Sequence, residues 1–375
     1  MTMPVPLNFI EKAFFKDDIL SIDIGYSNIK LVHTRKKQGG LLKIVRYAIE
    51  RTPQGCIRNG VIYNLQGIAN DLKMIMQERH INQKNVKIVI SAGSSIISRI
   101  IFIPKTKNGK LESNIKEEMA RQFSADIKPH KLFFRVTGEV LSNCVEYFRV
   151  LVTVVPDMII DNYIRLLNLL DFKPLILEIP FCSTARFFSR GVKLIDIKDK
   201  KASEYIDFDR KPTAVIDLGS ETTNVSVINN GALEFNKIVL AGGQYIDGLI
   251  AGKLEEKRDK AESLKKKHGI KDSDGSCSNI ERVVSGCAKD YLGELFVSTK
   301  KSLEYYADKC RGVPVNRIFL FGGGAGLNGL RKYAEEIMGL PVYTVDMMRF
   351  DNLQFDEGFE SEKIRYLVNS LGIAL

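Results

Sequence analysis

The chain contains only four histidines, no Cys-x-x-Cys pair and no long apolar run, and each shortage argues against a class of protein. The histidines are scattered, and the six cysteines include no Cys-x-x-Cys pair, so the sequence has no metal-binding cluster. We interpret the cysteines as reduced thiols of a cytosolic protein. No segment approaches the roughly 20 apolar residues of a membrane span. Residues 1–18 mix acids and lysines with apolar residues, unlike a secretory signal peptide.

The basic balance of the chain does not point to nucleic acid. Its net charge is +10 and its pI is about 9.1, but lysine and arginine are spread along the sequence. No DNA- or RNA-binding motif accompanies them, so we expect no nucleic-acid partner. From its positive net charge we expect only a mild attraction of the protein to an anionic membrane surface. With 375 residues, the chain is long enough for two domains of ordinary size.

The most informative feature is a glycine turn that occurs twice. Residues 22–32 read IDIGYSNIKLV, and residues 216–227 read IDLGSETTNVSV. In each copy an apolar strand ends in Asp-x-Gly, a few small or polar residues follow, and a second apolar strand begins. A third element, RIFLFGGGAG at residues 317–326, is a strand that ends in a run of glycines. Together these elements predict a nucleotide held between two similar halves.

The residue types in these turns suit a polyphosphate with a metal ion. Glycine lets backbone N–H groups approach a ligand closely, and consecutive N–H groups form an anion-binding concavity. Asp23 and Asp217 cannot donate to phosphate, but carboxylates can hold a hydrated Mg²⁺. We expect a helix that begins near Gly326 to present its positive end to the ligand. The hydroxyls of the two turns add neutral donors: Ser27, Ser220, Thr222 and Thr223.

Each element alone is weak support for a nucleotide site. An Asp-x-Gly hairpin is a common structural turn, and GGGAG could be a tight connection between a strand and a helix. The turns lack the Gly-Lys-Ser/Thr of a Walker A loop, and the glycine run does not fit the dinucleotide fingerprint. The ordered combination of the three elements favours nucleotide binding over these structural alternatives.

The same set resembles the two phosphate motifs and the adenosine motif of the actin-like ATPase superfamily, which includes actin, chaperone ATPases, sugar kinases and FtsA. Within it the sequence most resembles the type IV pilus assembly protein PilM family. That family opens with a stretch similar to residues 22–32. Further similarity lies in SRIIFIP at 98–104, SLEYY at 302–306 and LGIAL at 371–375.

The resemblance implies an α/β, actin-like (RNase H-like, duplicated) two-domain fold with a nucleotide cleft and an inserted subdomain of the kind shared by PilM and FtsA. We expect an N-terminal extension (1–18), a first half (19–92 and 157–211, completed by 350–375), an inserted subdomain (93–156) and a second half (212–349). Within the second half, Asn229-Asn230-Gly231 predicts a hairpin turn, and residues 244–267 predict a long helical region.

The resemblance also assigns site residues. It implies ATP and Mg²⁺ as cofactors, Asp23 and Asp217 as metal-holding acids, and Asp217 and Glu178 as catalytic groups, with Glu178 positioning the attacking water. A solvated glutamate at a strand end is the alternative for Glu178. Glu262 and Lys265 match a helix that contacts ribose and adenine, although a surface charge pair is the alternative. The remaining expected nucleotide contacts are Gly25, Tyr26, Ser27, Asn28, Lys30, Gly219, Ser220, Glu221, Thr222, Thr223, Gly322, Gly323, Gly324 and Ala325.

Two departures from the superfamily pattern affect the expected activity. Asn224 stands seven residues after Asp217, where chaperone ATPases carry a second carboxylate. Tyr26 stands where a small residue is usual, and it can crowd the terminal phosphate. Positioning and metal electrostatics carry phosphoryl transfer, so these changes reduce hydrolysis more than binding. We therefore expect slow hydrolysis or none.

By resemblance, the chain is a cytosolic adaptor peripheral to the inner face of the cell membrane. It would bind the short cytosolic tail of a PilN-like membrane protein, with other platform and motor ATPase components as further partners and homo-oligomerisation left open. The first alternative is an FtsA-like division filament, but the sequence ends at the core helix without a membrane-binding helix. The second is a sugar-kinase-like phosphotransferase, for which we find no dedicated substrate-binding aspartate.

Overall fold

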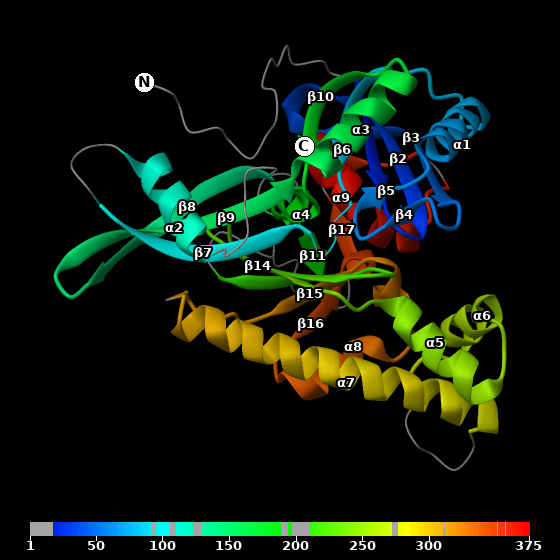
Figure 1. Cartoon of the computed structure of the whole chain (residues 1–375). Coiled ribbons are helices and arrows are strands. Elements are labelled where there is room, and N and C mark those ends of the chain that lie inside the picture. Colours follow the sequence, from blue (N-terminus) through cyan, green and yellow to red (C-terminus); the bar gives the residue numbers. More distant parts are fainter. Residues whose placement is uncertain are drawn as a thin grey trace.

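The computed structural model (Figure 1) describes residues 18–91, 93, 95–105, 110–122, 130–188, 194–196, 211–271, 277–310, 312–350, 352–356 and 358–375. The expected N-terminal extension, apart from Asp18, lies outside the described residues. Among the described helices, none combines the length and the apolar character needed to cross a membrane.

A six-stranded sheet forms the first half, in the order β10-β6-β1-β2-β3-β18. The three strands β1, β2 and β3 form an antiparallel meander, and β6 and β10 run parallel to β1. Strand β18 adds to the far edge beside β3. The bounds of the strands are β1 Asp18–Ile24, β2 Asn28–Lys36, β3 Leu42–Arg51, β6 Asn85–Val89, β10 Lys173–Glu178 and β18 Leu353–Gln354.

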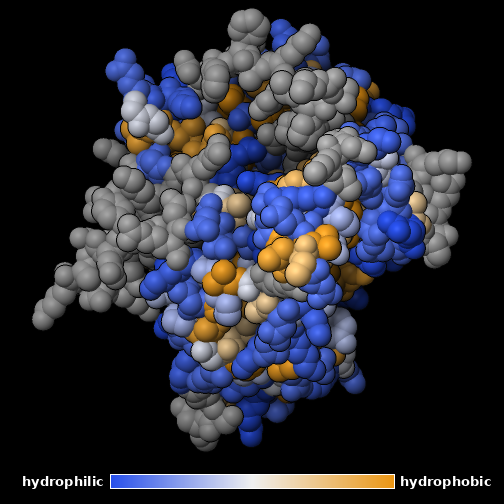
Figure 2. All heavy atoms as spheres, turned by 90° about the vertical axis from the view of Figure 1, so that its left-hand side faces the viewer, coloured by the Kyte–Doolittle hydropathy of each residue, from blue (hydrophilic) through white to orange (hydrophobic). Residues whose placement is uncertain are grey.

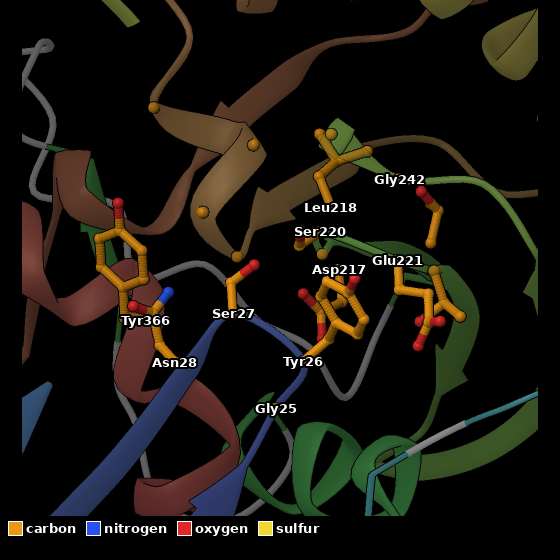
Figure 3. Close-up of a pocket in the computed structure, with 18 of the residues that line it drawn as sticks. Gly25, Tyr26, Ser27, Asn28, Asp217, Leu218, Ser220, Glu221, Gly242 and Tyr366 are labelled. Carbon is orange, nitrogen blue, oxygen red and sulfur yellow. The ribbon is translucent and has the colours of Figure 1, made fainter. Parts of the chain in front are cut away.

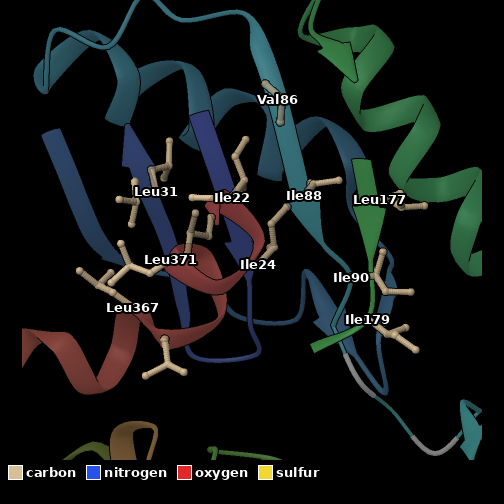
Figure 4. Packing of buried hydrophobic residues seen from close by; sticks show 14 of the residues in the cluster. Ile22, Ile24, Leu31, Val86, Ile88, Ile90, Leu177, Ile179, Leu367 and Leu371 are labelled. Carbon is tan, nitrogen blue, oxygen red and sulfur yellow. The ribbon is translucent and has the colours of Figure 1, made fainter. Parts of the chain in front are cut away.

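Strand β1 is buried over most of its length, and its residues alternate between the two faces of the sheet. Ile22 and Ile24 lie on one face and are fully buried, and Figure 4 shows them beside Leu367 and Leu371 of the C-terminal helix α9. Ser21 and Asp23 lie on the other face and are buried as well. The other elements of this half are the short strands β4 (Ile57–Arg58) and β5 (Val61–Ile62) and the helices α1 (Leu65–Glu78), α3 (Asp157–Leu169), α4 (Pro180–Arg186) and α9 (Ile364–Ala374).

The second half repeats this topology in a sheet of order β14-β13-β12-β15-β16. Again the first three strands form an antiparallel meander, and the later strands run parallel to the first one. The bounds of its strands are β12 Thr213–Leu218, β13 Thr223–Asn229, β14 Ala232–Val239, β15 Ile318–Phe321 and β16 Val342–Thr344. Its helices are α5 Gly243–Leu254, α6 Arg258–His268, α7 Asn279–Asp308 and α8 Leu330–Met338. The duplicated actin-like architecture expected from the sequence is therefore present.

The inserted subdomain is a three-stranded antiparallel sheet, β7-β9-β8, with helix α2 on one side. It has its own apolar cluster, in which Ile115 and Met119 of α2 pack on Val150 and Val152 of β9. On the face shown in Figure 2, hydrophobic side chains form separate groups among hydrophilic ones. The bounds are β7 Ile97–Pro104, α2 Leu111–Gln122, β8 His130–Ser142 and β9 Val145–Pro156. A further two-stranded pair joins β11 (Leu194–Asp196) to β17 (Met348–Phe350).

Two local expectations in the second half meet different outcomes. The turn between β13 and β14 is confirmed, because Asn230 and Gly231 take the positive φ values of 48° and 67° that a two-residue hairpin requires. The region 244–267 is helical as expected, but it consists of two helices. Glu255 adopts a left-handed conformation with φ 54°, and this residue ends α5 before α6 begins.

Candidate functional site

The two glycine turns have the same geometry. In the first, the Gly25 amide donates to the Asn28 carbonyl at 2.9 Å, and in the second the Gly219 amide donates to the Thr222 carbonyl at 3.1 Å. In each turn the glycine lies two residues after the aspartate, and its amide bonds to the carbonyl of the residue three positions further along the chain. The repeat seen in the sequence is a repeat of backbone structure.

The residues after each glycine supply the donors that a ligand can use. The glycine amides are occupied within their own turns. The amides of Tyr26, Ser27, Ser220 and Glu221 make no hydrogen bond to any described residue, and all four residues line the same cavity. Unpaired N–H groups in consecutive turn residues form a concavity suited to phosphate oxygens. We expected a phosphate-binding role for these turns from the sequence.

The two turns and the glycine run line one cavity with a volume of about 360 Å³. Figure 3 shows Tyr26 and Ser27 from the first turn opposite Asp217 and Ser220 from the second. The expected site residues that the structure brings to this lining are Asp23, Gly25, Tyr26, Ser27, Asn28, Lys30, Asp217, Gly219, Ser220, Glu221, Thr222, Thr223, Glu262, Lys265, Gly322, Gly323 and Gly324.

The glycine run forms the wall beside Asp217. Gly322 has φ 84° and ψ 173°, a conformation open essentially to glycine, and a Cβ there would lie 2.3 Å from an Asp217 carboxylate oxygen. A Cβ at Gly324 would lie 2.9 Å from the Leu218 side chain. The expected helix start near Gly326 is wrong. A 3₁₀ turn spans Gly323–Gly326, and α8 begins only at Leu330.

The two aspartates differ in their electrostatic surroundings although they occupy equivalent positions. Strand pairing places Lys30 opposite Asp23 and Asn224 opposite Asp217. Asp23 forms an ion pair with Lys30 at 3.0 Å. Burial raises the pKa of Asp217 to about 7, the charge of Lys30 opposes the shift and that of Asp23 adds to it. Asn369 donates to the same carboxylate at 3.4 Å.

Helix α6 contributes the two charged residues expected at the adenosine side. Both Glu262 and Lys265 lie on the cavity lining, and both are paired with protein groups. Lys265 contacts the Asp247 carboxylate at 2.7 Å and donates to a backbone carbonyl of α5. Glu262 binds Lys266 at 2.6 Å and Arg51 of the first half at 3.5 Å. The Arg51 contact therefore crosses the cleft between the two halves.

Two expected site residues do not line the cavity. Ala325 is the buried residue of the 3₁₀ turn and is absent from the lining. Glu178 is 2% exposed and is absent from the cavity lining; it accepts from Arg186 at 2.6 Å and from Ser183 at 2.7 Å. Burial raises its pKa despite the neighbouring charge of Arg186. Its carboxylate is thus committed to an internal network, and neither reading of Glu178 from sequence matches this placement, since it is not solvated either.

Several residues that line the cavity could not be predicted from the sequence. Tyr366 and Asn369 come from the C-terminal helix α9, Asp247 from α5, and Leu292 and Leu295 from α7. They share no motif with the turns, and each reaches the cavity only because distant helices pack around it. The apolar side chains of α7 give this cavity a hydrophobic wall beside its polar loops, a combination common in ligand sites.

The donor set fits a magnesium nucleotide. Among the described residues, no group of three or more His, Cys, Asp and Glu could hold a metal ion. Magnesium needs no such cage, because it keeps several waters and binds one or two carboxylates together with phosphate oxygens. Asp23 and Asp217 are the carboxylates on this lining that precede the two turns, and the side-chain oxygen of the buried Asn224 has no hydrogen-bond partner in the described part of the chain. The glycine wall leaves room where any Cβ would collide.

Comparison with known proteins places this geometry in a family. A solved structure of a PilM–PilN type IV pilus biogenesis complex superposes with a TM-score of 0.74 at 19% identity, covering 95% of this chain and 97% of that one. The ethanolamine utilization protein EutJ from Carboxydothermus hydrogenoformans matches with a TM-score of 0.54 at 14% identity, covering 95% and 88%. These likenesses confirm the actin-like fold expected from the sequence.

Sequence comparison adds two matches. The cell division protein FtsA of Neisseria meningitidis serogroup B (strain ATCC BAA-335 / MC58) is 27% identical over 154 residues, which cover 35% of each chain. The chain thus spans about a third of the length of this curated relative. The sequence model described as type IV pilus assembly protein PilM matches residues 21–375. This chain therefore belongs to the type IV pilus assembly protein PilM family, as its motifs indicated.

Proposed function

We propose that this protein is an ATP-binding adaptor of the inner-membrane platform that assembles type IV pili or of a related secretion machine. The observation that carries the proposal is the pair of matching glycine turns, Asp23–Asn28 and Asp217–Thr222, that face each other across one cavity. Free backbone donors and hydroxyls from both turns converge there. Such a site binds the phosphates of one nucleotide between two halves of the molecule, and so links ligand binding to the angle between them.

Different residues around the cavity would bind different parts of the nucleotide. The amides of Ser27 and Ser220 and their neighbours would bind the phosphates, and Asp23 and Asp217 would hold Mg²⁺ through its waters. Mg²⁺ supplies positive charge that neutralises the phosphates. The 3₁₀ turn and the apolar side chains of α7 would receive the adenosine. We propose slow hydrolysis or none, because Asn224 provides no ionisable group beside Asp217 and the Glu178 carboxylate, which is not on the cavity lining, is bound to Arg186 and Ser183.

The partner that we propose is the cytosolic tail of a PilN-like membrane protein. The superposed family structure is a complex of PilM with PilN. In the present chain the first half and the inserted subdomain meet around a hollow of only about 10 Å³, lined by buried residues that include Phe133, Val155 and Glu178. We therefore propose that the tail binds along the surface of this junction rather than inside it. The adaptor would then lie at the inner face of the membrane through its partner.

Calorimetric titration with ATP tests the nucleotide site. We expect the Asp217→Ala variant to lose most of its affinity for ATP in Mg²⁺ but little in EDTA, because its carboxylate acts through the metal. Asp290→Asn, an exposed acid on α7, is the control that should bind like the parent protein. Equal losses for Asp217→Ala in both buffers would contradict the metal role, and no binding by the parent protein would contradict the proposal.

Affinity purification from gently solubilised native membranes, with Mg-ATP present, tests the partner. We expect a single-span protein with a short cytosolic tail together with pilus components, identified by mass spectrometry. Recovery of a tubulin-like division protein would replace this proposal by the FtsA-like alternative, which the FtsA similarity keeps in view. Binding of a synthetic peptide with the sequence of the recovered tail then measures the contact directly.

A further inference from the structure

Two helices connect the halves and cross each other with their backbones in close contact. Helix α4 follows the last strand of the first sheet, and α9 ends the chain; Figure 1 shows both near the centre of the molecule. At the crossing, a Cβ on Gly372 of α9 would lie 2.0 Å from the Ser183 carbonyl oxygen of α4. The two helices therefore pack as closely as backbones allow, and a displacement of either one must move the other.

A buried hydrogen-bond chain runs from this crossing to the nucleotide cavity. Thr184 of α4 donates its hydroxyl to the Asn369 side-chain oxygen of α9 at 2.9 Å. The Asn369 amide nitrogen in turn donates to the Asp217 carboxylate at 3.4 Å. All three belong to different elements, and Thr184 and Asn369 are 4% and 7% exposed. An ionised carboxylate only accepts, so the Thr184 bond fixes the amide orientation that Asp217 needs.

The other carboxylate oxygen of Asp217 is restricted as well. It lies against Gly322, where an added Cβ would be 2.3 Å away. The Gly322 amide donates to the Arg365 carbonyl of α9 at 2.9 Å. Helix α9 thus contacts Asp217 on both sides, through Asn369 directly and through the backbone of Gly322. The second aspartate of the site is held by the helix that packs on the first sheet.

We infer that Asn369 is a positioning residue for Asp217, and that the chain Thr184–Asn369–Asp217 connects metal-nucleotide binding at the second turn to the crossing of α4 and α9. The inference rests on the proposed nucleotide-binding function. An aspartate that holds a metal ion must keep one oxygen toward the ion, and a partner on its other oxygen sets that orientation. When the metal draws Asp217 into place, the amide of Asn369 follows it, and the strain reaches α4 through Thr184.

The arrangement of the two sheets explains why nucleotide binding would be coupled to the helix crossing through Asp217. The first turn is anchored in the sheet that α9 covers, whereas Asp217 belongs to the second sheet. A ligand that joins the two turns changes the angle between the halves only if some element transmits the change. The described structure places one polar chain, rather than apolar packing alone, between the second turn and α4. Polar chains of this kind have two distinct arrangements, made and broken, and can therefore act as a switch.

Four variants test the inference. Asn369→Ala removes the donor to Asp217, and Thr184→Val removes the donor that orients Asn369 while it keeps the shape of the side chain. Thr184→Ser restores the hydroxyl. Ser370→Ala is the matched control, since Ser370 neighbours Asn369, is also buried, and its hydroxyl has no partner among the described residues.

The first readout is the ratio of ATP affinity in Mg²⁺ to that in EDTA. We expect Asn369→Ala to weaken Mg-ATP binding by about 10-fold or more and to leave binding in EDTA within about 3-fold, as is typical for a residue that orients a metal ligand. Thr184→Val should shift the ratio in the same direction, and Thr184→Ser and Ser370→Ala should keep the parent ratio. A purely structural hydrogen bond would lower both affinities together, and that result would overturn the inference.

The second readout is amide hydrogen exchange at saturating Mg-ATP. In the parent protein we expect slower exchange in α4 and α9 when nucleotide binds, and in Thr184→Val we expect the response of α4 to disappear although nucleotide is bound. An unchanged α4 response would overturn the coupling. If Asn369→Ala does not fold, Thr184→Val carries both tests. If the parent protein binds no ATP, the proposed function fails; if it binds and all variants keep its Mg²⁺ dependence, only this inference fails.

Discussion

Replacement of Gly322 by alanine tests whether the glycine run is shaped by Asp217. The residue has φ 84° and ψ 173°, and its missing Cβ would lie 2.3 Å from an Asp217 carboxylate oxygen and 2.8 Å from the Leu218 carbonyl oxygen. Alanine would therefore be unfavourable for two reasons: its backbone would adopt a conformation that only glycine takes readily, and its methyl group would overlap two oxygens.

The expected loss of stability follows from these two terms. A non-glycine residue in such a backbone conformation costs about 1–3 kcal/mol. Overpacking of a buried site by one methyl group costs about 1–3 kcal/mol more. We expect Gly322→Ala to lower the free energy of unfolding by roughly 2–6 kcal/mol and to displace the Asp217 carboxylate, so that Mg-ATP binding is lost as well.

The neighbouring glycine provides the matched control. A Cβ at Gly323 would meet only a ring carbon of Tyr366 at 3.2 Å, and the backbone there has no positive φ. We expect Gly323→Ala to lower the free energy of unfolding by less than about 1 kcal/mol, while a bulky residue such as Gly323→Val should block nucleotide binding in a folded protein.

Urea unfolding followed by circular dichroism and tyrosine fluorescence measures these differences, because the chain has 13 tyrosines and no tryptophan. Hydrogen exchange in β12 and β15 then shows whether the loss is localised beside Asp217. The reasoning is refuted if Gly322→Ala is as stable as the parent protein, or if Gly323→Ala is the more damaging of the two.

Three further predictions concern other parts of the molecule. Arg149 of the inserted subdomain and Glu234 of the second half form a buried ion pair at 2.8 Å, so Arg149→Met should lower the free energy of unfolding by about 3–5 kcal/mol in urea, and adding Glu234→Gln should recover part of it; full tolerance of the single change would contradict the pairing. Burial lowers the pKa of Lys87 from 10.5 to about 8, with Arg186 adding to the shift. Between these values the unfolded chain holds a proton that the folded chain has lost, so the stability of the parent protein relative to Lys87→Met should rise with pH, by up to about 3 kcal/mol; parallel pH curves would refute this. Asn224→Asp should raise the rate of phosphate release from ATP, measured with a phosphate sensor, and an unchanged rate would show that Asn224 does not limit hydrolysis.

The sequence predicted the parts of this protein that local chemistry decides. An Asp-x-Gly turn between two apolar strands has few conformations available, and both copies form the same closed turn, with the Gly25 and Gly219 amides bonded three residues ahead. Asn230-Gly231 likewise adopts the hairpin turn that its residues favour. One wrong expectation concerns a helix start: a 3₁₀ turn over Gly323–Gly326 precedes α8, which begins only at Leu330. The region 244–267 is helical, but the left-handed backbone of the exposed Glu255 ends α5 within it.

What only the tertiary structure decided is where side chains from distant elements meet. The sequence gives no sign that Asn369 and Tyr366 of the last helix reach a cavity built by residues 23–28 and 217–222, because packing of α9 between the sheets brings them there. In the same way, Glu178 looked like a strand-end acid but its carboxylate is buried against Arg186, away from the nucleotide cavity. The geometry of a turn depends on a few neighbouring residues and can be predicted from the sequence. The partner of a buried polar group depends on how whole helices pack, and only the tertiary structure shows it.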